Sequence, residues 1–162
     1  MIVTYLGKDK VKIKTREANV VITSETVDID GFVIDSPGEY ERKNIFVESP
    51  FDQPRVYKML VEDVTLLYVG KTEKINNKQI EQLDGIDLLF LPCGEENSMK
   101  LKDALELSAT LDPGIIMPIL YGDVEVLKKE GIEGEITKSA KISKSSLPQE
   151  DNIIIILEKS AS

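Results

Sequence analysis

Apolar runs and amphipathic segments alternate regularly between Thr65 and Tyr121, and this is the longest such pattern in the chain. Three short apolar runs, at residues 65–71, 86–92 and 115–121, are separated by segments with apolar residues at helical spacing. Two parallel strands need a connection of about a dozen residues, usually a helix. This order therefore predicts a βαβαβ unit around a buried parallel sheet.

The two helices of this unit have different end signals. Asn76 or Asn77 can cap the first helix, and Gly85 ends it. Ser98 is expected to cap the second helix, which cannot continue past Pro113. The apolar stripe of the second helix consists of Leu101, Ala104, Leu105, Ser108 and Leu111.

Outside this unit the pattern predicts short strands joined by turns. They are expected at residues 2–6, 11–14, 19–23, 32–34, 45–47, 56–61, 64–69, 135–137, 141–143 and 152–157. The strands at 56–61 and 64–69 form a hairpin that turns at Glu62 and Asp63, and Asp123 caps a short helix that ends at Gly131. The last strand contains four consecutive isoleucines and is expected to be fully buried.

Composition limits the size and the partners of the protein. The chain has 162 residues, of which 41% are hydrophobic, so residues 1–162 are expected to form a single domain. Its formal net charge of -9 disfavours nucleic acid and anionic membranes as partners. Lys138, Lys141 and Lys144 recur at intervals of three residues, and we interpret them as a solvated edge.

The cysteine and histidine counts restrict the chemistry. Cys93 is the one cysteine, so no disulfide can form within the chain. We therefore expect a cytoplasmic protein, since no signal-peptide pattern and no apolar run of membrane-spanning length is present either. Histidine, the commonest metal ligand and the usual general base, is absent.

Two groups of residues invite a chemical interpretation. Cys93 follows a strand end, but Glu95 and Glu96 would raise its pKa, so a packed and inert thiol is favoured over a nucleophile. An acid-rich segment could offer oxygen ligands to Mg²⁺ or Ca²⁺, but its spacing matches no ligand loop, and solvated charge is favoured. The acids of this segment are Asp28, Asp30, Asp35, Glu39 and Glu41.

Several motifs together resemble the metallo-β-lactamase fold. The strongest is Val33 to Glu41, which is similar to the family's proline-glycine-glutamate-tyrosine turn. Weaker matches are residues 2–7 to the opening strand, 66–92 to a strand-helix-strand segment, 115–121 to the last core strand, and 147–157 to the usual ending. The resemblance is to small bacterial and archaeal metal-dependent hydrolases related to L-ascorbate-6-phosphate lactonases. It implies an αββα sandwich with mixed sheets, in the α/β class and in trimmed form.

The departures from this family concern its metal ligands. The H-x-H-x-D-H signature is absent, and only eight residues separate Thr23 from Phe32, where the strand and helix that carry it would lie. Tyr68 and Lys71 stand where the resemblance places a histidine and an aspartate, and Leu120, next to Tyr121, stands where it places the last ligand histidine. The resemblance therefore implies a fold kept without its metal, and no cofactor is expected.

We interpret the protein as a non-catalytic interaction or structural module that binds a protein partner or a second copy of itself as a homodimer. The first alternative is a hydrolase with relocated chemistry, which would use Asp35, Glu39 and Glu41 with Mg²⁺ or Mn²⁺, or Lys71 as acid or base. The second is a small-ligand binder. The vestigial cleft that each alternative would use is expected to contain Tyr68, Lys71, Cys93, Leu120, Tyr121 and Glu39.

Overall fold

Alternating buried and exposed residues begin at Ile2 and produce five consecutive strands in the first 34 residues. The computed structural model describes residues 1–72, 74–94 and 98–160. The five strands are β1 (Ile2–Gly7), β2 (Lys10–Lys14), β3 (Asn19–Ile22), β4 (Val27–Ile29) and β5 (Phe32–Ile34). They pair in order, antiparallel, and β13 (Ser139–Lys141) joins the free side of β1 to complete a six-stranded sheet.

The second sheet has eight strands and mixed direction. Its antiparallel part consists of β6 (Gly38–Arg42), β7 (Ile45–Ser49), β8 (Val56–Val61) and β9 (Val64–Val69). Its parallel part adds β10 (Leu88–Pro92), β11 (Ile115–Ile119), β12 (Glu135–Thr137) and β14 (Ile153–Leu157). The order across the sheet is β12-β14-β11-β10-β9-β8-β7-β6. The βαβαβ unit predicted between Thr65 and Tyr121 is thereby confirmed.

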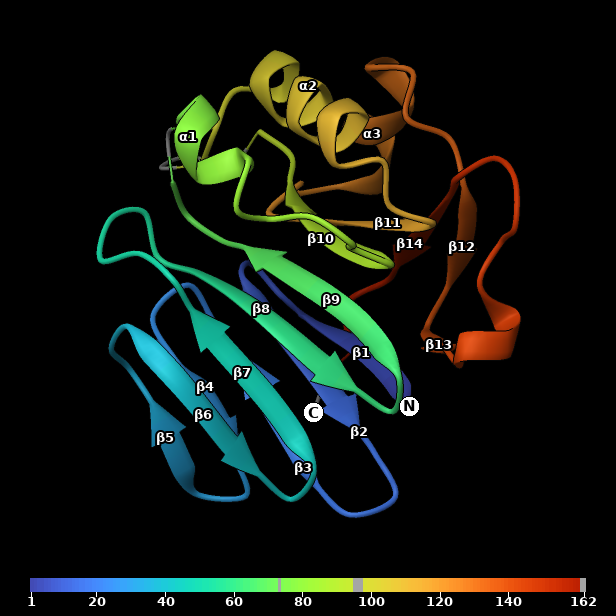
Figure 1. Ribbon diagram of the computed structural model, residues 1–162. Coiled ribbons are helices and arrows are strands. Elements are labelled where there is room, and N and C mark those ends of the chain that lie inside the picture. Colours follow the sequence, from blue (N-terminus) through green and yellow to red (C-terminus); the bar gives the residue numbers. More distant parts are fainter. Residues whose placement is uncertain (73, 95–97, 161–162) are drawn as a thin grey trace.

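Three helices accompany the larger sheet. They are α1 (Asn77–Ile80), α2 (Leu101–Leu111) and α3 (Val124–Lys129), and one 3₁₀ turn, η1 (Lys144–Ser146), precedes β14. In Figure 1 the helices lie beside β10 and β11, whereas the outer face of β6, β7 and β8 is free of helices. The buried side chains of both sheets belong to one hydrophobic cluster, which also includes buried residues of α2 and α3. The expected α/β class with two packed sheets is confirmed, and strands β1 to β5 follow one another without an intervening helix.

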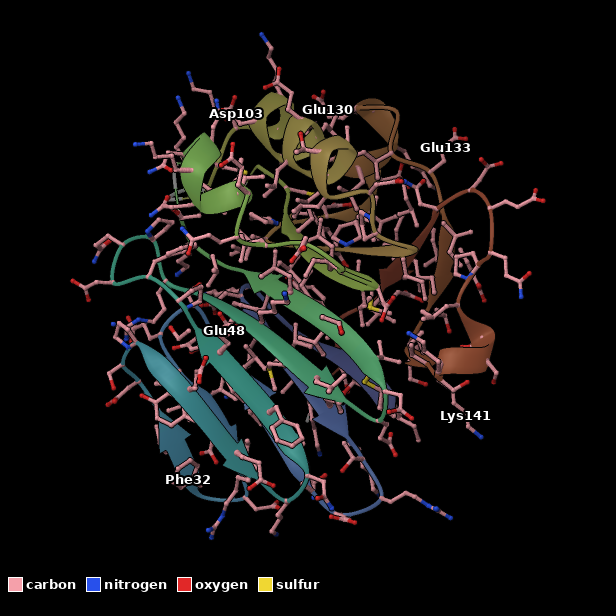
Figure 2. All side chains as sticks on the ribbon, viewed as in Figure 1. Phe32, Glu48, Asp103, Glu130, Glu133 and Lys141 are labelled. Atoms are coloured by element: carbon pink, nitrogen blue, oxygen red, sulfur yellow. The ribbon has the colours of Figure 1, made fainter. Side chains whose placement is uncertain are left out.

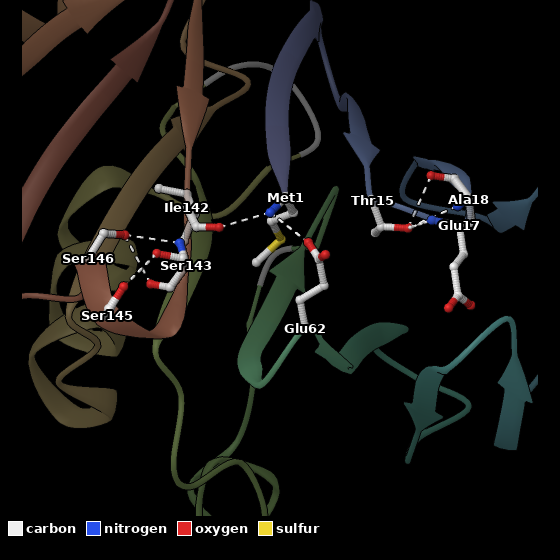
Figure 3. Close-up of polar contacts among 9 residues, drawn as sticks. All are labelled: Met1, Thr15, Glu17, Ala18, Glu62, Ile142, Ser143, Ser145 and Ser146. Carbon is white, nitrogen blue, oxygen red and sulfur yellow. Dashed lines mark hydrogen bonds and ion pairs between the residues drawn. The ribbon is translucent and has the colours of Figure 1, made fainter.

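Polar contacts tie the first residue to distant strands. The Met1 amine donates to the Ile142 carbonyl at 2.9 Å and lies 2.6 Å from the Glu62 carboxylate in the β8–β9 turn (Figure 3). Glu62 and Asp63 both have positive φ, at 48° and 65°, which is the geometry of a two-residue hairpin turn. The hairpin predicted at these two residues is confirmed.

Two strands lie where the sequence predicted none, because acidic residues concealed their alternation. In β4, Val27 and Ile29 are buried and Asp28 points to the other face. Strand β6 continues the proline-glycine turn through Glu39 and Glu41. The solvated charge expected for this segment therefore lies in part on the wet faces of these strands, at Asp28, Glu39 and Glu41, whereas Asp30 and Asp35 lie outside them.

Two predictions about the second helix, its N-cap and its apolar stripe, were wrong. The N-cap of α2 is Lys100, without a side-chain bond to the helix, and not Ser98. Leu107 is buried together with Ala104 and Ser108, whereas Leu105 is 41% exposed. The apolar stripe is therefore narrower than predicted and turned toward Leu107. By contrast, Asn76 caps α1 as expected, and its amide oxygen accepts from the Gln79 N–H at 2.9 Å.

The last strand is only partly buried, contrary to the prediction. Ile155, Ile156 and Leu157 are buried, but Ile153 is 43% exposed, because β12 pairs with β14 only from Ile155 onward. Within the described residues, no helix is long and apolar enough to cross a membrane.

Candidate functional site

The carboxyl ends of β9, β10 and β11 meet at one edge of the larger sheet, because parallel strands run in the same direction. Ligand sites of open α/β sheets commonly lie at this edge. Five of the six predicted cleft residues come from it, namely Tyr68, Lys71, Cys93, Leu120 and Tyr121. The Cys93 N–H donates to the Ile119 carbonyl at 2.9 Å, so the ends of β10 and β11 are in contact.

Glu39 does not belong to this group. It lies exposed on β6, the edge strand of the sheet, three strands away from β9. Its direct cross-strand neighbour is Glu48 on β7. The structure therefore removes Glu39 from the predicted cleft, because the turn at Pro37 leads into this edge strand and not toward the ends of the parallel strands.

The hydroxyl of Tyr68 is used inside the protein. It donates to the carbonyl of Asp9 in the β1–β2 turn, and its ring lies 6.2 Å from that of Phe90. The side chain is fully buried. Burial, followed by the nearby Asp9 carboxylate, raises the pKa of Tyr68 well above its ordinary value. Tyr68 therefore remains a neutral hydrogen-bond donor.

Leu120 and Tyr121 close the neighbouring part of the edge. The Leu120 N–H lies 3.0 Å from the Lys8 carbonyl and 3.2 Å from the hydroxyl of Tyr5, and it can donate to both. The hydroxyl of Tyr121 donates to the Leu157 carbonyl at 2.5 Å, and its ring lies 5.5 Å from that of Tyr5. Burial raises the pKa of Tyr121 to about 12. Apolar and hydrogen-bonded groups thus fill this part of the edge.

Cys93 is a buried thiol, as the sequence predicted, but Glu95 and Glu96, which the prediction named as the cause of its raised pKa, lie outside the described residues. Its Sγ lies 3.4 Å from the Leu91 carbonyl, and burial raises its pKa to about 12. Thiolate, the reactive form, is then negligible near neutral pH. We expect native protein at pH 7.5 to react with an aromatic disulfide reagent at least about a hundredfold more slowly than protein unfolded in urea. Reaction of the folded protein at the unfolded rate would show that Cys93 is accessible.

Lys71 differs from the other four residues, because it is exposed. Its backbone N–H donates to Oγ of Ser24 at 2.8 Å, and the Ser24 N–H donates to the Asp9 carboxylate at 3.0 Å. Gly70 lies against Ser24 so closely that an added Cβ would come within 2.9 Å of the Ser24 Cα. These contacts fix the β3–β4 turn against the end of β9. A cavity of about 860 Å³ opens beside Lys71.

Tyr5, Asp9, Ser24 and Arg55 also belong to this region, and the sequence analysis missed all four. The Tyr5 hydroxyl accepts from the Leu120 N–H, and the Asp9 carbonyl accepts from the Tyr68 hydroxyl. Both contacts join the two sheets, and no local motif reveals them. Arg55 donates to the Asp35 carbonyl and lines the cavity next to Lys71. A possible signal was the Gly70-Lys71 pair after a strand, which marks a turn into which another segment can pack.

The donor atoms at the strand ends do not fit a zinc or manganese ion. Such ions take histidine nitrogen, thiolate or carboxylate ligands. The groups present are two buried phenols, a protonated thiol and the side chain of Leu120. Across the described part of the chain, no three His, Cys, Asp or Glu side chains are grouped so that they could hold a metal ion. The acids proposed for Mg²⁺ or Mn²⁺, Glu39 and Glu41 on β6 and Asp35 before it, belong to no such group.

Two sequence comparisons connect this chain with known proteins. The sequence profile of the beta-lactamase superfamily domain matches residues 4–120. A UPF0173 metal-dependent hydrolase from Enterococcus faecalis is 35% identical over 69 residues, which are 42% of this chain and 31% of the relative. The chain thus spans about a third of the length of that curated relative.

Solved structures show the same fold at low identity. A candidate zinc-dependent hydrolase of the metallo-beta-lactamase superfamily from Thermotoga maritima superposes with a TM-score of 0.77 at 17% identity, over 96% of this chain and 97% of that one. The metallo hydrolase Igni18 from Ignicoccus hospitalis gives a TM-score of 0.57 at 14% identity, over 81% and 91% of the two chains. These likenesses show the sandwich fold that the sequence motifs implied.

Proposed function

The chain belongs to the beta-lactamase superfamily, and from this premise we propose that it is a non-catalytic member that acts by binding another protein chain. One observation carries the proposal: the strand ends where the resemblance places metal ligands are closed by tyrosine hydroxyls bonded to backbone carbonyls. Tyr68 reaches Asp9 and Tyr121 reaches Leu157. We further propose that residues 1–162 form one cytoplasmic domain, which the shared core of the two sheets and the single cysteine support.

The chemistry of these residues argues against hydrolysis through a metal. A bound divalent ion lowers the pKa of water to about 7 and so supplies hydroxide at neutral pH. Tyrosines that stay neutral and Leu120 offer no anionic or nitrogen ligand for such an ion. Lys71 would add a positive charge at the mouth of the same region. A member of the family without these metal ligands would keep its fold, and its surface could still bind another protein.

The uncovered face of the larger sheet is the surface that supports a role in binding. Phe46 and Leu60 are 52% and 40% exposed and lie directly opposite each other on β7 and β8. Glu39 and Glu48 are also opposite each other, although like charges in this position are destabilising. Figure 2 labels Glu48 on β7, next to the edge strand β6 of the larger sheet, and Phe32 on β5, an edge strand of the smaller sheet. Exposed edges and apolar pairs are typical of interaction surfaces.

A cationic partner fits this face better than a second copy of the chain. Two copies joined edge to edge along β6 would bring Glu39 and Glu41 of each chain together, and like charges repel. A homodimer through the apolar residues of β5 is the other arrangement. Light scattering distinguishes a homodimer from binding to a different protein. A mass equal to that of one chain, measured on the isolated protein, favours a different protein as partner.

A hydrolase with relocated chemistry is the second candidate, and the names of the relatives favour it. It would use Lys71 as acid or base, or carboxylates such as Glu39 with Mg²⁺ or Mn²⁺.

One experiment separates these candidates. Protein purified with added Zn²⁺, Mn²⁺ or Mg²⁺ is analysed for bound metal and screened against lactones, phosphodiesters and carboxylic esters. We expect substoichiometric metal and no turnover. Lys71→Ala and Glu39→Ala are the diagnostic variants, and Lys129→Ala, an exposed change on α3, is the control. Turnover that Lys71→Ala or Glu39→Ala abolishes, while Lys129→Ala retains it, would contradict the non-catalytic proposal.

A further inference from the structure

The cavity beside Lys71 has the size of a small-molecule site. Its volume of about 860 Å³ falls within the range of roughly 300–1,000 Å³ that is usual for ligand pockets. Four segments line it: the β3–β4 turn, the loop before β8, the segment after β9 and the start of α1. Of the five residues at the strand ends, Lys71 lines this cavity and the other four do not.

Hydrogen bonds hold the walls of this cavity in place. Ser24 accepts from the Lys71 N–H at 2.8 Å, which fixes the β3–β4 turn to the end of β9. Gln79 on α1 donates from Nε2 to the Gln53 carbonyl at 2.8 Å, which fixes the helix to the loop before β8. The capping box between Asn76 and Gln79 orders the start of α1. The opening is therefore formed before any ligand arrives.

The charged groups of the walls favour an anion. Lys71, Lys74 and Arg55 line the cavity, against two described acids, Glu25 and Asp52. Within the described residues, neither lysine amine has a carboxylate within 4.0 Å. Among the described residues that line the cavity, cations thus exceed acids by one, whereas the chain as a whole carries a net charge of -9.

Arg55 is held in place in the wall of the cavity. One terminal nitrogen donates to the Asp35 carbonyl, and the other lies 3.7 Å from Asp52, whose side chain is 83% exposed. The Nε atom is buried and has no hydrogen-bond partner. Because Nε is inaccessible to solvent, Arg55 would contribute to the cavity through its positive charge and through the quarter of its side chain that is exposed.

We propose that this cavity binds a small organic anion, with its carboxylate or phosphate between Lys71, Lys74 and Arg55. Glu25 and Asp52 then accept hydrogen bonds from hydroxyl or amine groups elsewhere on the same ligand. The inference rests on the proposed function in one respect: because the protein is proposed to be non-catalytic, the anion is bound and released unchanged. Binding needs no metal, because the contacts are made by protein side chains.

The test is isothermal titration of metal-free protein, in EDTA, with citrate, pyrophosphate and inorganic phosphate, and with glucose as a neutral control. We expect at least one of the anions to bind and glucose not to bind. Lys71→Gln and Lys74→Gln are each expected to weaken binding about tenfold, since each removes one charge-assisted contact. Lys129→Gln, an equal charge change on the exposed side of α3, should bind as the original protein does.

Three results would overturn the inference. The first is no binding of any of the three anions at millimolar concentration. The second is equal weakening by Lys129→Gln and Lys71→Gln, which would indicate only the general effect of charge. The third is binding that requires added Zn²⁺ or Mn²⁺, which would contradict the proposed function as well. Conversion of a bound anion to a product would contradict the non-catalytic role alone and leave the location of the site intact.

Discussion

Gly70→Ala is expected to lower the free energy of unfolding by about 1–3 kcal/mol, because the new methyl group has no room. A Cβ at Gly70 would lie 2.3 Å from Oγ, 2.8 Å from Cβ and 2.9 Å from Cα of Ser24. The clash includes the backbone, so a rotamer change of Ser24 cannot relieve it. The β3–β4 turn must move away from the end of β9, and the Lys71–Ser24 hydrogen bond is lost.

Urea unfolding followed by circular dichroism measures this loss. Gly114→Ala is the matched control, because a Cβ there would meet its nearest atoms, Asp87 O and two Pro148 carbons, at 3.4 Å. Both variants carry the same change in the unfolded chain, so the difference between their free energies of unfolding reports the clash at Gly70. Equal stabilities of Gly70→Ala and Gly114→Ala would show that the turn does not pack on the strand end as described.

Stability is expected to fall steeply as the pH rises above about 10, because several buried groups must stay protonated in the folded protein. Burial raises the pKa of Tyr121 from 10.0 to about 12 and that of Cys93 from 9.0 to about 12, and it also raises the pKa of Tyr68. A raised pKa in the folded state contributes stability below the unfolded pKa, and this contribution disappears as the pH approaches the folded pKa. For Tyr121 the loss amounts to about 3 kcal/mol between pH 10 and 12.

Urea unfolding at several pH values between 8 and 11.5, with tyrosinate absorbance at each, measures this effect. Tyr121→Phe removes one titrating group and keeps the ring against Tyr5. Its stability at pH 8 should be lower, because the Leu157 carbonyl loses its donor, but its stability should depend less on pH above 10. Ionisation of Tyr121 near pH 10 in the folded protein would refute the buried hydroxyl arrangement.

The sequence predicted the fold well where apolar periodicity was strong. Strands β9, β10 and β11 carry nearly continuous apolar runs, and turn residues such as Glu62 and Asp63 mark their ends. Strands β4 and β6 were missed because Asp28, Glu39 and Glu41 occupy their exposed faces. An acidic residue on the wet face of a strand reads locally like one in a loop, and only pairing with a neighbouring strand distinguishes the two.

The candidate site was predicted in part, for a topological reason. Tyr68, Lys71, Cys93, Leu120 and Tyr121 gather because each lies at the end of a parallel strand, and that order is visible in the sequence. Their partners were not visible, because the hydroxyls bond to backbone carbonyls of Asp9 and Leu157, whose side-chain types are irrelevant to the bond. The Tyr68 contact depends on how the two sheets are stacked, and the Tyr121 contact depends on the pairing of β11 with β14. Local sequence encodes neither arrangement.

The pairing of β13 with β1 has a consequence for synthesis of the protein on the ribosome. Ile2 pairs with Lys141, and β14, which contributes the Leu157 carbonyl, lies between β11 and β12. The first 120 residues, which correspond closely to the part shared with the superfamily, therefore emerge with one side of β1 and one side of β11 lacking their neighbours. Until residues 121–162 have been translated, these two open sides are where a nascent chain would need protection by chaperones against pairing with other molecules.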